Sequence, residues 1–544
     1  MKRTIAVVAA VAIAAGALVT AGSADAAPSA ARTTATAAAR SVPVTPSSID
    51  WGPCDDPTLQ EVGAVCGMLA VPLDYAKPHG RKIHLAVSMV RHTVPDSQYQ
   101  GIMLVNPGGP GGSGLVLSFL GEFVPNGAGD YYDWIGFDPR GVGASTPSLS
   151  CIPDYNQGPR PNYTPVNQHV ERAWLKRSAA YGKACERDGG ALLNHVTTAD
   201  SARDMNSIRI AMGQQKLNYF GFSYGTYLGS VFGTMFPNRL RRAVFDSTVD
   251  PTHAWYQANL DQDVAFERNI KVWFAWVAKY DSVYHLGKTE AKVEALYYKT
   301  QSQLFKHPAG GVVGGDEWAD ILLGAGYFQA TWLDLGDLFS AWVNNHDTAR
   351  LVEEYEATES IGDDNNYAMY LATECSDAPW PQNYAKIKRD NLAVARNHPF
   401  VTWANAWFNG PCLGWPGEAR KAAVKVDGSA VQSLLMIDEK LDAATPYSGS
   451  LVVRKLFPNA SLIALPGGTS HANSLFGDAC EDDQIAAYLA DGTLPARRPG
   501  NRADAYCAPL PVPDPTAAAA ARTLKQSAVA AELVRLRLAA TRAG

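Results

Sequence analysis

The sequence predicts an α/β protein with a mostly parallel sheet, and two observations support this fold class. Short apolar runs end in turn signals and alternate with helical patterns, as in a parallel sheet that is covered on both faces. A Trp-rich, mostly helical stretch then interrupts this rhythm at 251–425 and holds 10 of the 13 Trp residues. Because cap domains are inserted between strands in this way, we expect a core at 50–250 and 426–507 with a helical cap at 251–425.

Six apolar runs are the expected strands of the core. They cover 102–106, 134–138, 217–220, 243–246, 433–437 and 461–465. A helix is expected over 201–213, because Gly213 provides a C-terminal stop just before the third of these strands. The chain order is therefore strand and helix in alternation, then the cap, then two further strands.

Both ends of the chain differ in composition from the core. Residues 1–26 combine a basic start, an apolar run and small residues before a cleavage point after Ala26, which predicts a secretory signal. Residues 27–46 have almost nothing to bury and predict a flexible tail or pro-segment. Residues 508–544 open with four prolines and predict a Pro-rich break followed by a helical tail. We therefore expect a secreted, extracellular protein that leaves the membrane once its signal is removed.

Charge and composition exclude two broad classes of protein. The 47 Lys and Arg residues against 53 Asp and Glu residues give a net charge of −6, so nucleic acid is not an expected partner. Charged residues make up only 18% of the chain and apolar residues 47%, which excludes disorder throughout. A globular enzyme, expected to be a monomer, fits these numbers.

The eight Cys residues form an even set in a chain predicted to be exported, which indicates disulfides. Of the 105 possible connectivities, we expect sequential pairing, which closes loops of modest length: Cys54–Cys66, Cys151–Cys185, Cys375–Cys412 and Cys480–Cys507. The chain has no C-x-x-C and no H-E-x-x-H pattern, so a metal site is not expected.

The motif that carries chemistry is Gly221-Phe-Ser223-Tyr-Gly225, a match to G-x-S-x-G. The pattern alone is weak, and its context supplies the specificity. It follows an apolar strand and opens a small-residue helix, as a nucleophile elbow requires. The flanking glycines permit a turn tight enough to present the hydroxyl of Ser223 at the sheet edge, next to a helix N-terminus that favours negative charge.

A serine nucleophile needs a base, and that base needs an orienting carboxylate. His471 is the candidate base, because it lies in a glycine-bearing loop just after the last apolar strand. Asp442 is the favoured acid, since it follows the preceding strand by a few residues. Asp438, closer to that strand, and Asp246, at the end of an earlier strand, remain alternatives.

A second glycine-rich loop follows the first strand of the core, at 106–114. Its unhindered N–H groups are suited to one half of an oxyanion hole, for which Gly108 and Gly109 are the candidates, with the N–H of Tyr224 as the other half. The loop fits a phosphate-binding role less well. Its sequence is not G-x-x-x-x-G-K-[ST], and its prolines remove backbone N–H donors that a phosphate would need.

Together these motifs resemble those of the α/β-hydrolase serine peptidases of the prolyl aminopeptidase family, in particular the secreted tripeptidyl aminopeptidases of actinobacterial type. The resemblance covers about 50–507 and rests on 107–111, on Asp-Pro-Arg-Gly-Val-Gly-Ala-Ser at 138–145, on the elbow, and on the acid and base loops. Pro107 stands where the family shows His, a departure that fits the tripeptidyl-releasing branch. The resemblance implies an α/β-hydrolase fold with an inserted cap and no cofactor.

The family also implies peptide substrates that are cleaved from the free N-terminus. Such an enzyme needs a carboxylate in its cap to pair with the substrate's α-ammonium. Glu374 and Asp377 are the candidates, next to an expected disulfide at Cys375. The alternative function is a secreted carboxylester hydrolase with the same triad, because the machinery does not distinguish an amide from an ester.

Overall fold

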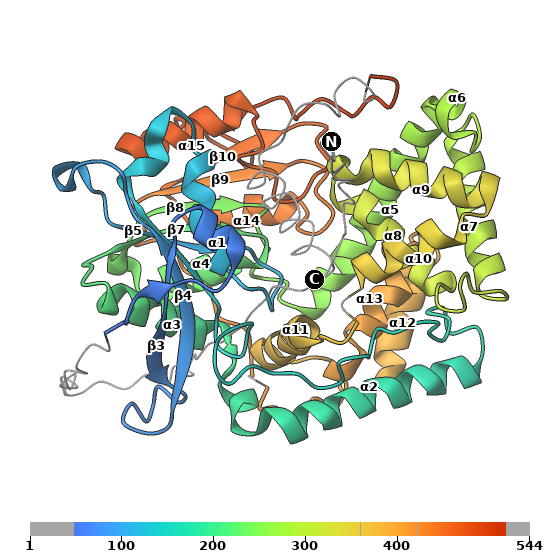
Figure 1. The fold of residues 1–544 in the computed structure, drawn as a ribbon, viewed down its shortest axis with the longest axis horizontal. Helices are drawn as coiled ribbons and strands as arrows, with labels where there is room; N and C mark the ends of the chain where they lie inside the picture. The colour runs from blue at the N-terminus through green and yellow to red at the C-terminus, as the bar shows by residue number, and fades with distance from the viewer. Residues whose placement is uncertain (1–47, 360, 420, 518–544) are drawn as a thin grey trace, which may run out of the picture.

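The computed structural model describes residues 48–517 except 360 and 420. The predicted signal at 1–26, the segment at 27–46 and the helical part of the predicted C-terminal tail lie outside the described residues. Within the described ranges, no helix is long and apolar enough to cross a membrane. The core and the Trp-rich helical insertion lie side by side (Figure 1).

The core is one ten-stranded sheet in the order β11-β10-β9-β8-β7-β5-β6-β4-β3-β2. Neighbours from β11 to β6 pair in parallel, and β4, β3 and β2 add an antiparallel edge. The strands are β2 (Gly52–Pro53), β3 (Val65–Pro72), β4 (Lys82–Val90), β5 (Ile102–Asn106), β6 (Asp133–Phe137), β7 (Leu217–Phe222), β8 (Leu240–Asp246), β9 (Leu434–Glu439), β10 (Ala460–Leu465) and β11 (Ala505–Tyr506).

The central strands are apolar throughout because both faces of the sheet are covered. In β9, Leu434 and Met436 join one core cluster, and Leu435 and Ile437 join the cluster on the opposite face, as the two-residue period of a strand requires. The helices α3 (Thr198–Ala211), α4 (Tyr224–Met235) and α14 (Ser448–Leu456) contribute to the first cluster. The helix α15 (Ala479–Asp491) and the 3₁₀ segments η2 (Leu115–Phe123) and η3 (Pro125–Tyr131) contribute to the second.

All six predicted strands and the predicted helix are present. Their observed bounds differ from the expected ones by no more than three residues at either end. The antiparallel edge and β11 were not anticipated. All four disulfides pair sequentially, as expected: Cys54–Cys66, Cys151–Cys185, Cys375–Cys412 and Cys480–Cys507.

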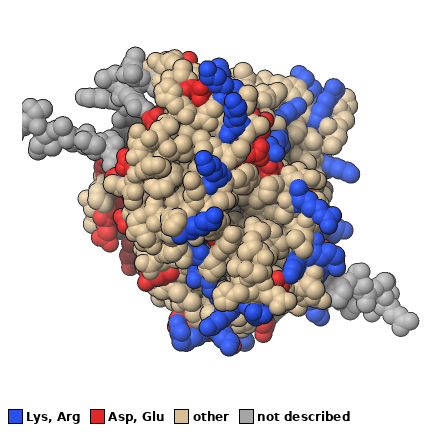
Figure 2. All heavy atoms as spheres, turned by 90° about the vertical axis from the view of Figure 1, so that its right-hand side faces the viewer, with Lys and Arg blue, Asp and Glu red and all other residues tan. Residues whose placement is uncertain are grey.

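Between β8 and β9 the chain forms a set of helices that we call the cap. They are α5 (Tyr256–Lys279), α6 (Asp281–Tyr284), α7 (Glu290–Leu304), α8 (Gly315–Tyr327), α9 (Trp332–Asn345), α10 (Thr348–Thr358), α11 (Asn365–Asp377), α12 (Tyr384–Ala395) and α13 (Thr402–Phe408). Helices α5 and α7–α10 enclose a hydrophobic core of their own, to which Ala443 and Ala444 of the core also contribute. Figure 2 shows the side of the molecule formed by the cap, where Lys and Arg side chains lie scattered.

The helix α2 (Gln168–Gly189) and the segment before it pack against the cap, although their sequence precedes it. Trp174 of α2 stacks on Trp407 of α13 with ring centroids 5.8 Å apart, and α2 runs beside α11 and α12 (Figure 1). Upstream of α2, the guanidinium of Arg160 pairs with Glu317 of α8 at 2.7 Å. The helical layer beside the core therefore includes residues from the 50–250 range.

Candidate active site

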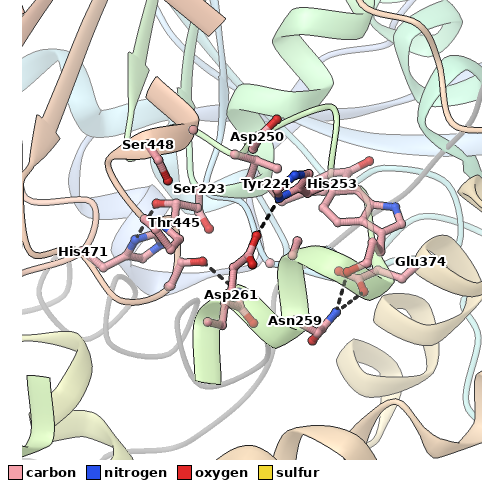
Figure 3. A pocket seen from close by; sticks show the side chains of 18 of the residues that line it. Ser223, Tyr224, Asp250, His253, Asn259, Asp261, Glu374, Thr445, Ser448 and His471 are labelled. Atoms are coloured by element: carbon pink, nitrogen blue, oxygen red, sulfur yellow. Dashed lines mark hydrogen bonds and ion pairs between the residues drawn. The ribbon is translucent and has the colours of Figure 1, made fainter. Parts of the chain in front are cut away.

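The loops after β5, β7, β9 and β10 meet at the carboxyl edge of the parallel strands, facing the cap. A cavity of about 710 Å³ opens there. Gly109, Ser223 and His471 line it from the core, and Glu374 lines it from α11 of the cap. Figure 3 shows Ser223 and His471 together on one side, and Glu374 with Asn259 on the other.

Ser223 occupies a strained turn between β7 and α4. Its backbone has φ 54° and ψ −127°, a conformation that non-glycine residues rarely adopt. The turn is held because the N–H of Ser223 donates to the carbonyl of Asp246 at 3.0 Å, and the hydroxyl of Thr226 donates to the carbonyl of Ser223 at 2.6 Å. Gly225 is required, since a Cβ there would lie 2.7 Å from the carbonyl oxygen of Asn106. This is the geometry of the predicted elbow.

The 106–114 loop approaches the elbow closely. Gly108 has φ +101°, and a Cβ on it would lie 2.6 Å from Cβ of Ser223, so only glycine fits. Its N–H already donates to Oδ1 of Asn106 at 3.1 Å. Of the two candidate donors from this loop, Gly109 is therefore favoured, and it lines the cavity together with Tyr224.

His471 and Asp442 are buried and bonded to each other. Nδ1 of His471 lies 2.7 Å from Oδ2 of Asp442, and the two side chains are 1% and 0% exposed. Oδ1 of Asp442 accepts from the backbone N–H groups of Ala444 and Thr445 at 2.9 and 3.0 Å. These bonds fix the position of the carboxylate, so that it orients the ring of His471.

Thr445 is a site residue that the sequence reasoning passed over. Its hydroxyl donates to Oδ2 of Asp442 at 3.0 Å and lies 3.3 Å from Nδ1 of His471. The signal was available, because Thr445 stands between Asp442 and a proline in the loop used to choose the acid. A hydroxyl at this place restrains the side chains of both Asp442 and His471.

The alternative acids have other partners. Asp438 accepts from the hydroxyl of Ser450 at 2.6 Å. Asp246 accepts from the N–H and the hydroxyl of Ser474 at 2.9 and 2.6 Å, which anchors the loop that follows His471. Only Asp442 of the three is seen bonded to that histidine in the described part of the chain, and the geometry favours it as the acid.

Of the two cap carboxylates, the structure brings one to the cavity. Glu374 lines it, is 4% exposed, and faces Nδ2 of Asn259 at 3.4 Å. Burial raises the pKa of Glu374 to about 8, and hydrogen bonds from Tyr370 and Asn259 act against that shift. Asp377 is not among the described lining residues and accepts from the N–H and hydroxyl of Thr198 at 2.8 and 2.5 Å. It therefore braces α11 against α3.

Asp250, His253 and Asp261 are among the further polar residues of the cavity that were not predicted. Asp250 and His253 come from the segment after β8, and Asp261 comes from α5. Nδ1 of His253 lies 2.6 Å from Oδ2 of Asp261, a pair visible in Figure 3. The described lining holds the carboxyl groups of Asp250, Asp261 and Glu374 and no Lys or Arg, so acidic side chains predominate over basic ones there.

The Asp-Pro-Arg-Gly motif that supported the resemblance is structural. The guanidinium of Arg140 is fully buried and bonds both carboxylate oxygens of Asp204 in α3 at 2.7 Å. It also donates to the carbonyls of Leu73 and His195. This bidentate pair ties the loop after β6 to α3, away from the described lining of the cavity.

Comparison with known proteins identifies relatives along almost the whole chain. A family model described as alpha/beta hydrolase fold matches residues 101–293, and one described as TAP-like protein matches 398–507. The chain is 40% identical over 499 residues to the tripeptidyl aminopeptidase of Streptomyces lividans, covering 89% of this chain and 90% of the relative. It is 30% identical over 475 residues to the serine protease Hip1 of Mycobacterium tuberculosis, covering 82% and 89%.

A more distant relative bears an esterase name. The carboxylesterase B of Mycobacterium tuberculosis is 29% identical over 476 residues, with 83% of this chain and 90% of the relative covered. The tripeptidyl aminopeptidase similarity is both stronger and slightly longer. The chain is thus a serine hydrolase of peptidase type with the α/β-hydrolase fold, and it belongs to the family of the tripeptidyl aminopeptidases.

Proposed function

We propose that this protein is a secreted serine aminopeptidase of the tripeptidyl or prolyl aminopeptidase type, which hydrolyses peptide bonds near a free N-terminus. The observation that carries the proposal is the layout of one acidic cavity. Ser223 and His471 lie on one side of it and the buried carboxylate of Glu374 on the other. A peptide whose α-ammonium pairs with Glu374 would present a nearby carbonyl to Ser223.

The chemistry assigned to the core residues is acyl transfer to Ser223. His471 takes the hydroxyl proton as Oγ of Ser223 attacks the scissile carbonyl, and Asp442 stabilises the imidazolium that forms. The N–H groups of Tyr224 and Gly109 stabilise the tetrahedral oxyanion. His471 then protonates the leaving amine, and water activated by the same base hydrolyses the acyl-enzyme.

Glu374 is assigned the recognition of the substrate's amine. A buried carboxylate binds an ammonium strongly only when it is ionised, and an adjacent positive charge favours that form. The ammonium of a bound peptide would therefore lower the raised pKa of Glu374 and form a charge-assisted hydrogen bond. An N-acylated peptide lacks this charge and would leave Glu374 protonated.

The discriminating experiment is a panel of substrates with matched leaving groups. We expect turnover of free-amine tripeptide or shorter anilides, much weaker turnover of their N-acetylated forms, and loss of both in Ser223→Ala with the fold retained. Glu374→Gln is expected to lower kcat/KM for free-amine substrates at least tenfold while leaving N-acetylated ones unchanged. Asp377→Asn serves as the matched control, because this second carboxylate of α11 is bonded to Thr198.

Each outcome of the panel decides between functions. Cleavage of N-acetylated peptides only would refute the aminopeptidase proposal. Hydrolysis of short acyl esters without peptide turnover would favour the carboxylester hydrolase, the activity named for the 29% identical relative. Full activity of Ser223→Ala would remove the proposed nucleophile altogether.

Export is proposed on separate grounds. Four disulfides join all eight Cys residues, a pattern typical of oxidising compartments. We expect the protein in the culture medium with its N-terminus at or after Ala27, measured by intact mass and N-terminal sequencing. Retention in the cell with residues 1–26 attached would contradict the predicted signal.

A further inference from the structure

A second cavity lies within the helical layer, separate from the triad. The empty space between its walls, which includes open solvent, is about 530 Å³. Residues of α5, α12 and α13 line it, with Leu175 of α2 at one side. Among the described lining residues, Asn259 alone is shared with the active-site cavity, and it stands between the two.

The walls of this cavity are aromatic. Tyr256 packs edge-on against Trp380 with ring centroids 5.7 Å apart, and Trp407 stacks on Tyr384 at 5.8 Å and on Trp403 at 5.9 Å. All five side chains line the cavity. The Trp residues that marked the cap in the sequence therefore form a wall here as well as a core, and aromatic faces attract cations.

One part of the cavity carries a buried carboxylate and a buried amide oxygen that has no donor in the described structure. Asp263 is 1% exposed and accepts from Nδ2 of Asn405 at 3.1 Å. Asn409 is 5% exposed; its Nδ2 donates to Asn259 and Asn405, while its buried Oδ1 has no partner in the described structure. The amide donors of Asn405 and Asn409 are thus engaged by the protein, and Oδ1 of Asn409 is left without a donor in the described part of the chain.

No Lys, Arg or His is among the described residues that line this cavity. A buried carboxylate is costly unless a cation or sufficient donors accompany it. Burial raises the pKa of Asp263 to about 8, and the charge of Asp261 adds to this shift. Hydrogen bonds with Asn405 and Thr402 act against it. The described lining of the cavity therefore offers Asp263 hydrogen bonds but no positive charge.

We propose that this cavity is a binding site for an organic cation, a protonated amine on an apolar or aromatic body. The ammonium would donate to Asp263 and to Oδ1 of Asn409, and the body would lie against the aromatic wall of Trp380, Trp403 and Trp407. The amine belongs either to a free small molecule or to a side chain of a bound peptide. This assignment does not depend on the proposed peptidase activity.

Calorimetry with 2-phenylethylammonium and its uncharged analogue 2-phenylethanol tests the site. Because Glu374 is itself a candidate amine ligand, the titration is made in Glu374→Gln, where the ammonium is expected to bind with 1:1 stoichiometry and at least tenfold more tightly than the alcohol. Asp263→Asn in that background retains an acceptor for Asn405 and is expected to abolish the tenfold preference. Ala406→Phe, which fills the cavity from α13, is expected to abolish binding of both compounds.

The result that overturns the proposal is amine binding that Glu374→Gln alone eliminates, since the ammonium would then sit only in the active-site cavity. Equal affinity for ammonium and alcohol in Glu374→Gln would also overturn it. Inhibition of peptide turnover by 2-phenylethylammonium, measured in the protein with Glu374 intact, distinguishes the two possible sources of the amine. Competitive inhibition that Asp263→Asn relieves identifies a subsite for a peptide side chain, and a non-competitive effect that Asp263→Asn relieves identifies a site for a free amine.

Discussion

The backbone N–H of His471 donates a hydrogen bond to the carbonyl oxygen of Tyr327 at 2.9 Å. Tyr327 is the last residue of α8 in the cap, and His471 lies in a loop of the core. The side chain of Asn269 reinforces this contact, because its Nδ2 lies 3.1 Å from the carbonyl of Gly326 and 3.2 Å from that of Thr469. The cap therefore holds the proposed base in place as well as covering the cavity.

Asn269→Ala tests whether this contact positions His471. The substitution leaves buried carbonyls without a donor and is expected to cost about 1–3 kcal/mol of stability, with a several-fold drop in kcat and little change in KM. Asn218→Ala is the matched control, because Nδ2 of Asn218 also bridges two carbonyls, those of Gln100 and Ile102, at the far end of β7. Thermal unfolding and steady-state kinetics measure both effects. An equal loss of kcat in the two variants would reduce Asn269 to a structural role.

Thr445→Val tests the hydroxyl beside the proposed acid–base pair. The side chain keeps its shape but no longer donates to Oδ2 of Asp442 or restrains Nδ1 of His471. We expect kcat to fall about tenfold, which corresponds to about 1.4 kcal/mol of transition-state stabilisation. Thr445→Ser restores a hydroxyl and is expected to recover most of the rate. A serine variant as slow as the valine one would mean that the methyl group, and not the hydroxyl, matters.

The sequence predicted the parallel strands well because their signal is local and strong. β5 and β7 are buried on both faces, and apart from Asn106 and Asn218 their residues are apolar, aromatic or glycine. The strand β3, second from the edge of the sheet, is covered less completely, since its Met68 is 39% exposed. The elbow around Ser223 was also readable, because its tight turn demands glycine at fixed positions.

The choice between Glu374 and Asp377 could not be made from the sequence. The two carboxylates lie three residues apart on α11, and both were plausible partners for an amine. What separates them is Thr198, which is 179 residues away along the chain and engages Asp377. The same holds for the contact between His471 and Tyr327, which depends on how the cap packs against the core.

Glu439 predicts a pH dependence of stability. Burial raises its pKa to about 8, and hydrogen bonds from the Ser470 N–H and from Asn473 act against the shift. Between the unfolded value near 4.5 and about 8 the folded state binds more protons, so stability falls as pH rises, by at most about 1.4 kcal/mol per pH unit from this group. We expect Glu439→Gln to remove the contribution of this group to the fall of stability with pH. The Asn473 amide can flip to donate to the new side chain or accept from it.

Denaturant unfolding at pH 5, 6, 7 and 8 measures this change. Exposed Glu353→Gln is the control and is expected to leave the wild-type slope in place. Glu374 and Asp263, whose pKa values are also raised to about 8 by burial, would still contribute to the slope in Glu439→Gln. A slope that is unchanged in Glu439→Gln would contradict the ascribed protonation of this side chain.

The disulfide Cys375–Cys412 joins α11, which carries Glu374, to the segment after α13. Replacing both residues by Ala opens a span of 37 residues and is expected to cost about 4 kcal/mol. Because α11 then loses a restraint next to Glu374, KM for free-amine substrates should rise several-fold while kcat changes less.

The control is the double variant Cys54→Ala with Cys66→Ala, which opens a span of 12 residues at the β2–β3 edge. Its expected cost is about 3 kcal/mol of stability, with no change in KM. Unfolding curves and kinetics at one temperature separate the two readouts, and a KM that rises equally in both double variants would attribute the effect to general destabilisation.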